Sequence, residues 1–388
     1  MTRLTTTLLG ASLRGALLLG LGSTGLAWST PHLPDSDAQV LAELPVGARH
    51  QSAPARELTR TRLDVALPLA QFYVARSRAS GDLRYLGYAE ALLAPWVRRT
   101  PVPPPVLVLE ATILQSRHAF DAALQQLDLA LQAQPDNAQA WLTRATVLRV
   151  QGRYADATSA CAHLAGKADA AITALCQQSI SGLNGHLGPA YAAVVSLPRQ
   201  PLDAEARAWR CSELGEMAER LGDDVAAEHW FGEGLQLAPE DVYMRAAYAD
   251  LLLRHARAAE TLRLLTGYES MEPMLLRIVI ARQLLGGSQG ADSRASLAAA
   301  FDVEQQRGEA VHRREQARFL LDVEQQPAAA LAAAQDNWRV QREPDDALIL
   351  LRSAQAAHQP AAAAPVLLYL QQQRLEDVRL EPYRRALR

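Results

Sequence analysis

The nine histidines and three cysteines are the side chains of this sequence best suited to binding a metal ion. Two histidines three or four positions apart on one helix, with a carboxylate between them, would form a zinc site of the zincin type. No two histidines have that spacing, and the cysteines form no CxxC pair. We therefore interpret the histidines as surface or loop residues and expect no metal. The alternative is a metal site that folding assembles from separate segments.

The sequence contains no set of motifs that would define an active site. A phosphate-binding GxxxxGK[ST] loop is missing. The glycine-rich segment 286–290 has no lysine after it and no strand pattern before it, so we interpret it as a turn between helices. The carboxylate pairs Asp223-Asp224 and Glu240-Asp241 lie beside turns, where acidic side chains cap helices. We therefore expect a non-enzyme with no catalytic residues and no cofactor.

Composition sets the class of protein. The 388 residues are 49% hydrophobic and carry a formal net charge of -3. Alanine and leucine dominate and β-branched runs are scarce, which favours helix along most of the chain. A nearly neutral chain without a polybasic segment offers no electrostatic basis for binding nucleic acid.

The N-terminus has the features of a secretion signal. Arg3 and Arg14 precede an apolar run over 15–27, and small residues follow at Gly25, Ala27 and Ser29. We expect a signal peptide at 1–29 and a flexible, proline-containing leader at 30–56; the alternative is an uncleaved anchor. No later stretch has eighteen uninterrupted apolar residues, so we expect no transmembrane segment in the mature chain. In a bacterium, such a chain would be periplasmic or secreted.

The rest of the chain repeats a helical pattern with a period of 34 residues. Small residues recur where two antiparallel helices approach closely, and aromatic residues recur just past the turn. The positions in register are Ala111, Leu114, Phe120, Ala123, Ala130 and Pro135; Trp141, Ala145, Leu148, Gly152, Tyr154 and Ala157; and Leu214, Gly215, Ala218, Gly222, Ala227, Phe231 and Pro239. This pattern resembles the tetratricopeptide repeat (TPR).

The resemblance implies an all-α fold, a right-handed superhelical solenoid of TPR-like helical hairpins over 57–388. The clearest repeats are 104–137, 138–171 and 208–241, and the repeats elsewhere are degenerate. Helical patterns continue to Gln373, with about nine hairpins in all. Each hairpin can bury its apolar stripe only against its neighbours, so we expect one array without a domain break.

In TPR proteins the first helix of each pair lines the concave face and contacts the partner. Carrying that register over gives a surface with both charge signs and one or two aromatic residues, which suits a peptide or a protein helix. The lysines and asparagines of the family's carboxylate-binding subgroup are absent. The candidate residues are Thr146, Arg149, Trp209, Glu216, Arg220, Tyr243, Asp250 and Arg254. The alternative for Trp209, Tyr243 and Arg254 is ordinary packing between repeats.

The repeat register also places Cys161 on the second helix of one pair and Cys176 on the first helix of the next. These helices pack together, so a Cys161–Cys176 disulfide fits the geometry in an oxidising compartment. Cys211 occupies the usual tryptophan position of its repeat and is expected to be a small buried residue.

The sequence therefore predicts a non-catalytic, exported scaffold that binds proteins in the bacterial envelope and assembles or regulates a membrane or periplasmic complex. One alternative is a periplasmic component of a polysaccharide-export or outer-membrane assembly machine. A less favoured alternative is a cell-wall lytic enzyme, which would need a separate catalytic domain, and only about fifteen residues follow the helical pattern.

Overall fold

The computed structural model describes residues 58–198, 202–286, 291–306 and 312–387. The expected signal peptide at 1–29 and leader at 30–56 lie outside these described residues. Residues Pro54–Arg388 form one compact unit, to which all of the following contacts belong.

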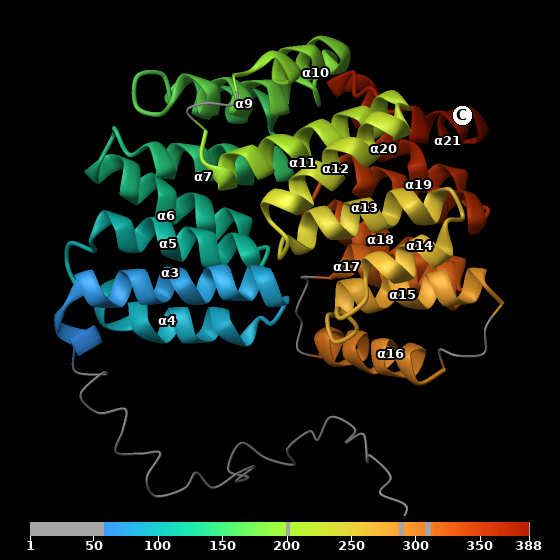
Figure 1. The fold of residues 1–388 in the computed structure, drawn as a ribbon, viewed down its shortest axis with the longest axis horizontal. Helices are drawn as coiled ribbons and strands as arrows, with labels where there is room; N and C mark the ends of the chain where they lie inside the picture. The colour runs from blue at the N-terminus through green and yellow to red at the C-terminus, as the bar shows by residue number, and fades with distance from the viewer. Residues whose placement is uncertain (1–57, 199–201, 287–290, 307–311, 388) are drawn as a thin grey trace, which may run out of the picture. The chain divides into compact units, whose positions relative to one another are not determined.

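The described part of the chain is helical and contains no strand, so the all-α prediction is confirmed. Successive helices pair into hairpins that stack on one another in chain order (Figure 1). The pairs are α3 (Leu63–Ser80) and α4 (Arg84–Val97), α5 (Pro104–Ser116) and α6 (Phe120–Ala133), α7 (Ala138–Val150) and α8 (Tyr154–Ala162), α9 (Ala170–Ser181) and α10 (Leu187–Ser196), α11 (Ala204–Leu221) and α12 (Asp224–Leu237), α13 (Val242–Arg254) and α14 (Ala258–Leu264), α15 (Glu272–Leu284) and α16 (Ala291–Gln306), α17 (Arg313–Arg318) and α18 (Pro327–Trp338), and α19 (Pro344–Ala356) and α20 (Ala364–Gln373). A short helix, α21 (Glu381–Ala386), follows.

Several of these helices begin with a polar side chain that caps the helix, at positions where the sequence indicates a cap. Asn137 accepts a hydrogen bond from the backbone N–H of Ala140, which leaves one fewer unpaired donor at the start of α7. Asp223 and Asp241 do the same at the starts of α12 and α13. These two aspartates therefore cap helices, as predicted from their position beside turns.

The repeated small residues are buried where helices approach closely. Ala111, Ala123 and Ala157 are completely inaccessible to solvent. Gly234 stands where alanine is usual in the repeat, because a Cβ there would overlap with the side chain of Met244 and lie 2.9 Å from the Cβ of Cys211. The packing of each hairpin thus depends on the absence of bulk at these positions.

One predicted helix is interrupted. The sequence predicts a continuous helix over 311–325, but α17 ends at Arg318 and a π-helix, Phe319–Val323, follows. The wider turn is seen in the hydrogen bond from the N–H of Glu324 to the carbonyl of Phe319, 3.0 Å long. It places both Phe319 and Val323 in the hydrophobic core, where they are 3% and 6% exposed.

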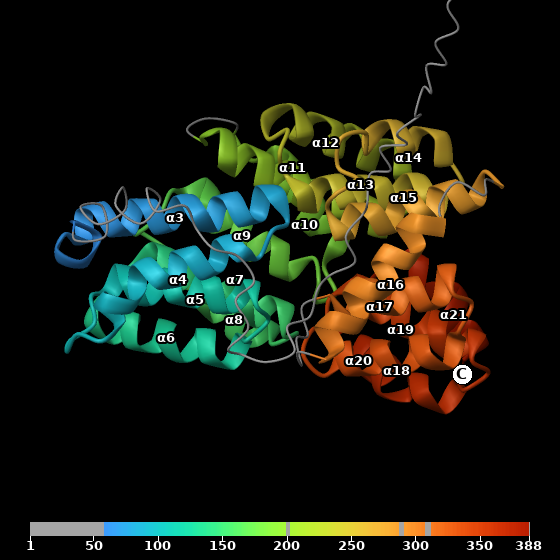
Figure 2. The ribbon, with the colours of Figure 1, turned by 90° about the horizontal axis from the view of Figure 1, so that it is seen from below.

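The C-terminal hairpins pack against the early repeats. One hydrophobic core contains residues from both 107–183 and 317–387. The backbone N–H of Arg342 donates to the carbonyl of Val150 at 2.8 Å, and the backbone N–H of Leu187 donates to the carboxylate of Glu376 at 2.7 Å. Helices α17 to α21 gather as one group in Figure 2. The fold is therefore held by contacts between repeats that are distant in the sequence, as well as by contacts between neighbouring repeats.

Candidate partner-binding site

The first helices of the hairpins line a large cavity, which we call the inner cavity. Its volume is about 1600 Å³. Residues of α3, α5, α7, α11, α13, α15, α17 and α19 all contribute to its wall. A smaller side pocket of about 440 Å³, between α7, α11 and α13, shares part of this wall. The helices that the TPR register assigns to a concave face therefore surround a common space.

Most of the candidate residues lie on these two surfaces. Trp209 lines the side pocket, where its indole N–H donates to Glu213 at 3.1 Å. Tyr243 lines both spaces and is 49% exposed, although the protein surrounds it. The other candidates on the wall of the inner cavity are Thr146, Arg149, Glu216, Asp250 and Arg254.

Arg220 is the exception, and its prediction as a partner-binding residue is corrected. It lines neither space and is only 3% exposed. Its guanidinium donates to the carbonyl of Gly182 at 2.7 Å, at the end of α9. Burial lowers the pKa of Arg220, partly offset by Asp377 and Glu216. Arg220 thus joins α11 to α9 instead of facing a partner.

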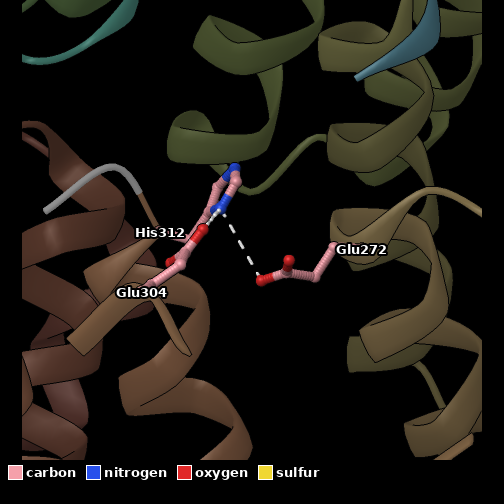
Figure 3. Close-up of side chains that lie close together, drawn as sticks. All are labelled: Glu272, Glu304 and His312. Atoms are coloured by element: carbon pink, nitrogen blue, oxygen red, sulfur yellow. Dashed lines mark hydrogen bonds and ion pairs between the residues drawn. The ribbon is translucent and has the colours of Figure 1, made fainter. Parts of the chain in front are cut away.

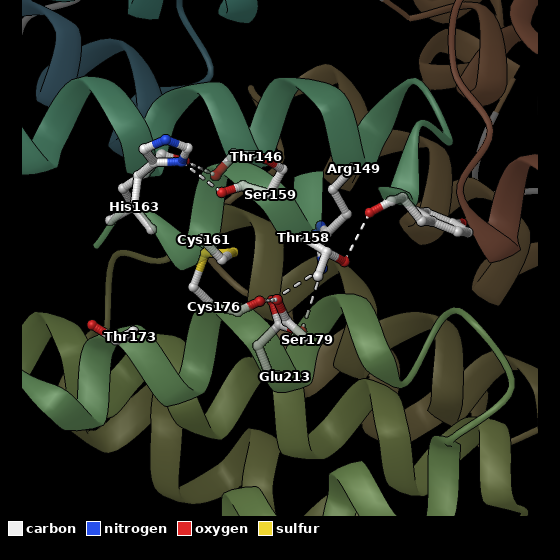
Figure 4. Close-up of a disulfide and its surroundings, with 12 residues drawn as sticks. Thr146, Arg149, Thr158, Ser159, Cys161, His163, Thr173, Cys176, Ser179 and Glu213 are labelled. Atoms are coloured by element: carbon white, nitrogen blue, oxygen red, sulfur yellow. Dashed lines mark hydrogen bonds and ion pairs between the residues drawn. A yellow bond between two sulfur atoms is a disulfide. The ribbon is translucent and has the colours of Figure 1, made fainter. Parts of the chain in front are cut away.

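Arg149 connects three helices across the inner cavity. It lies 3.0 Å from Glu213 of α11 (Figure 4). It also lies 3.4 Å from Glu343, the residue that precedes α19. Burial alone would lower the pKa of Arg149, but the charges of Glu213 and Glu343 outweigh it and raise the pKa. Arg149 is therefore a fixed cation whose partners come from both early and late repeats.

Asp250 and Glu219 hold the same kind of position further along the wall. Asp250 pairs with Arg277 at 2.5 Å and with Arg318 at 2.6 Å. Burial would raise the pKa of Asp250, but the two arginines lower it to about 2. Glu219 pairs with Arg254 at 2.5 Å and Arg379 at 3.0 Å. Ion pairs between first helices thus cover much of the cavity wall.

Sequence reasoning missed the partners supplied from outside the clear repeats. Glu343 and Arg379 both complete ion pairs with predicted residues or their neighbours, yet they lie in the degenerate C-terminal region. The only signal for them is indirect: a buried Arg149 or Glu219 requires an opposite charge nearby, since an unpaired buried charge is very costly.

His312 lies in the turn that precedes α17, so it is a loop residue, but it is not on the surface. It is 17% exposed at the start of α17, and its Nδ1 lies 2.6 Å from Glu304 and 3.6 Å from Glu272 (Figure 3). Burial would lower the pKa of His312, but the hydrogen bond and charge of Glu304 raise it to about 9. Burial raises the pKa of Glu272 to about 7.

This triad also has the composition of a metal-ligand set. One ligand atom from each of the three residues lies within 4.8 Å of the others. The raised pKa of His312 describes an imidazolium between two carboxylates, and its proton would have to leave before a metal could bind the nitrogen. The ion pair accounts for the geometry without a metal.

A disulfide joins Cys161 at the end of α8 to Cys176 in α9, with a Cα–Cα distance of 5.8 Å (Figure 4). The two residues are buried, as is Cys211, which is 1% exposed. The bond connects two successive hairpins near the wall that carries Arg149.

Two glycine motifs have the letter spacing of catalytic or cofactor-binding signatures. Residues 20–25 fit GxGxxG and residues 286–290 fit GxSxG. The first lies outside the described residues. The second follows helix α15, whereas a nucleophile elbow requires a preceding strand. In the described part of the chain, no helix has the length and apolar character needed to span a membrane.

Comparison with known proteins identifies a shared architecture. No protein-family model matches the chain, and no curated protein is significantly similar in sequence. A chain of the APC/C hetero-tetramer Cut9–Hcn1 superposes with a TM-score of 0.50 at 12% identity, covering 84% of this chain. This chain spans 63% of the length of that one.

Other similar structures superpose less well. They include a tetratricopeptide repeat protein from Parabacteroides merdae, with a TM-score of 0.36, 17% identity, and coverage of 64% of this chain and 98% of that one. Yeast Tom70 has a TM-score of 0.27 at 10% identity, with coverage of 87% and 96%. Of these three, the Cut9–Hcn1 chain superposes well enough to define a common arrangement. Together with the stacked hairpins, it identifies the fold of this chain as a tetratricopeptide-repeat solenoid.

Proposed function

We propose that this chain is a non-catalytic scaffold that binds a protein partner in its inner cavity. The observation that carries the proposal is a cavity of about 1600 Å³ lined by the first helices of successive hairpins. Tyr243 presents a large exposed ring inside it. A tyrosine contributes much contact area at a low cost in conformational entropy, which favours its use in protein recognition.

We also propose that the protein acts in the bacterial envelope after export. The arginines and apolar run of the first 29 residues support export. The Cys161–Cys176 disulfide supports it independently, because disulfides persist in oxidising compartments and are rare in the cytosol. The role would be assembly or regulation of a membrane or periplasmic complex.

The binding proposal is tested by cross-linking and affinity purification of the tagged full chain from cells of the source organism. Tyr243→Ser removes the exposed ring, and Arg78→Glu reverses an exposed charge in the inner cavity. The matched control is Leu129→Ser, which changes a 50% exposed residue of α6 outside both spaces.

Wild type and Leu129→Ser should recover the same proteins, and the two cavity variants should lose them. Equal recovery by all four proteins would overturn the inner cavity as the binding site. Circular dichroism of each variant establishes that the fold is retained.

Export is tested by fusing residues 1–57 to alkaline phosphatase, which is active only outside the cytosol. The fusion should be active, and Leu17→Arg/Leu18→Arg, which breaks the apolar run, should abolish the activity. An inactive, fully expressed wild-type fusion would overturn export.

A further inference from the structure

The side pocket carries an excess of negative charge. Four of the residues on its wall are acidic: Glu205, Glu213, Glu216 and Asp241. Among the described residues, the single cation on that wall is Arg149. The pocket shares part of its wall with the inner cavity, because Arg149, Glu216 and Tyr243 line both spaces.

Three of the four carboxylates are already engaged or balanced. Glu213 is 5% exposed and holds both Arg149 and the indole N–H of Trp209. Asp241 caps α13. Arg78, from α3, acts electrostatically on both Glu205 and Asp241. The surrounding wall of the inner cavity limits its hydration and lowers its pKa, and these two carboxylates partly offset that effect.

Glu216, like Glu205 and Asp241, has no ion pair among the described residues, and Arg149 is the one cation among the groups that chiefly act on it. The groups that act on it are Glu213 on the same helix, Arg149 of α7, Glu343 before α19, and Tyr243 of α13. Arg149 is held by Glu213 and Glu343 at 3.0 and 3.4 Å. Burial raises the pKa of Glu216 to about 8, and Glu213 adds to that effect. Both effects favour the neutral carboxyl, so a cation placed beside Glu216 would stabilise its ionised form and supply the counter-charge that it lacks.

Two aromatic residues share the wall with Glu216. Trp209 is fixed by its hydrogen bond to Glu213, and Tyr243 is 49% exposed. Aromatic faces attract cations, and arginine in particular stacks on them. Carboxylate, indole and phenol together suit a flat or elongated cation better than a neutral side chain.

We propose that the side pocket receives a cationic side chain, arginine or lysine, of the protein partner, with Glu216 as its counter-ion and Trp209 and Tyr243 beside its stem. This inference rests on the proposed function, since it names the chemistry by which a partner is recognised.

The probe is N-acetyl-L-arginine amide, and its matched control is N-acetyl-L-citrulline amide, which has nearly the same shape and no charge. Binding to the full chain is measured by isothermal titration and ligand-observed NMR. The arginine compound should bind saturably and about tenfold more tightly than the citrulline compound, since a charge pair is lost in the latter. Equal binding of the two compounds, or binding of neither, would overturn the proposal.

Three variants locate the site. Glu216→Gln should weaken binding of the arginine compound by about tenfold, and Tyr243→Leu should weaken it by a few-fold. Glu90→Gln should leave it unchanged, because Glu90 pairs with Arg117 outside both spaces and its side chain is 38% exposed. An affinity that survives Glu216→Gln would assign the compound to another surface and overturn the proposal.

The dependence on pH separates a counter-ion from a merely structural glutamate. The probe stays cationic throughout, so its affinity should rise about tenfold from pH 7 to pH 9 as Glu216 ionises. Tyr243 stays neutral, because burial and Glu216 raise its pKa. Glu216→Gln should flatten the profile, and this comparison removes contributions from His312. A profile that is the same in wild type and Glu216→Gln would contradict the role of Glu216.

Partner capture by affinity purification distinguishes failure of the scaffold proposal from failure of the side-pocket proposal. If Tyr243→Ser and Arg78→Glu abolish partner capture but the arginine and citrulline compounds bind equally, the pocket inference fails and the scaffold proposal stands. If neither variant affects partner capture, the inner cavity fails as the binding site, whatever the probe does.

Discussion

Gly152 lies directly against the phenol group of Tyr369, at the point where the turn between α7 and α8 meets α20. A Cβ at position 152 would overlap with the hydroxyl oxygen of Tyr369 and lie 3.1 Å from the Cβ of Arg342. The backbone of Gly152 has a φ of +72°, in the left-handed region. Glycine is therefore required at this turn both for its conformation and for the contact with the C-terminal hairpins.

We predict that Gly152→Ala lowers the free energy of unfolding by about 2 to 4 kcal/mol, which combines backbone strain with steric overlap. Urea denaturation followed by circular dichroism measures the loss. Gly166→Ala is the matched control, because Gly166 also has a φ of +72° but no atom lies within 4 Å of the place that a Cβ would take there. It should cost only about 1 kcal/mol. Equal losses in the two variants would show that Tyr369 does not confine position 152.

The disulfide predicts how many free thiols the protein has before and after reduction. Unfolded, non-reduced protein should react with one equivalent of Ellman's reagent, from Cys211, and reduced protein with three. Cys161→Ala/Cys176→Ala should lower the free energy of unfolding by up to about 3 kcal/mol, because the bond closes a short loop in the unfolded chain. Cys211→Ala should retain the bond and serves as the control. Three reactive thiols in protein purified without a reducing agent would contradict the disulfide.

Features that depend on contacts within one repeat can be predicted from the sequence. The small residues Ala111 and Ala157, and the cap at Asp241, follow from a repeating pattern because a hairpin forms from contacts within about 34 residues. The TPR register likewise assigns most of the cavity wall to the first helix of each hairpin, and Thr146 and Tyr243 line it.

Contacts between distant repeats have no such pattern. The packing of Tyr369 on Gly152 and the ion pair between Arg149 and Glu343 each join segments that no period relates. For the same reason the register places Arg220 on the concave face. In the structure its guanidinium instead donates to the carbonyl of Gly182 on another hairpin, so its side chain does not face the cavity. The triad of His312 also comes from three segments, so the spacing of histidines gives no sign of it.

Arg379 provides a prediction on how the C-terminal segment is held. It pairs with Glu219 at 3.0 Å and with Asp377 at 2.7 Å, and its side chain is 9% exposed. Arg379→Leu should lower the free energy of unfolding by about 3 to 5 kcal/mol, because it leaves the buried Asp377 without a counter-charge and Glu219 with Arg254 alone. Chemical denaturation measures the loss.

Arg384→Leu is the control for this measurement, since it removes an arginine from α21 whose partner, Glu381, is 48% exposed. Its cost should be below about 1 kcal/mol. A loss for Arg379→Leu no larger than that for Arg384→Leu would mean that water, and not Arg379, stabilises Glu219 and Asp377.

His312 makes the stability of the protein depend on pH above neutrality. Its pKa is about 9 in the folded chain, against an ordinary value of about 6.5, so the folded state holds a proton that the unfolded state releases between these values. The stabilisation is complete below about pH 6.5 and is lost as the pH rises through 9. The size of the loss follows from the shift and amounts to about 3 kcal/mol.

Urea denaturation at pH 6.5, 7.5, 8.5 and 9.5 should therefore show a falling free energy of unfolding in the wild type and a flatter profile in His312→Gln. Glu304→Gln should shift the fall to lower pH, because it removes the hydrogen bond and charge that chiefly hold the proton on His312. Glu272 loses its proton at a lower pH than His312, because burial raises its pKa only to about 7. Its effect on the free energy of unfolding is therefore a decrease between about pH 4.5 and 7, outside most of the range that reports on His312. If wild type and His312→Gln decline in parallel above pH 7, the imidazolium is not part of what holds α15, α16 and α17 together.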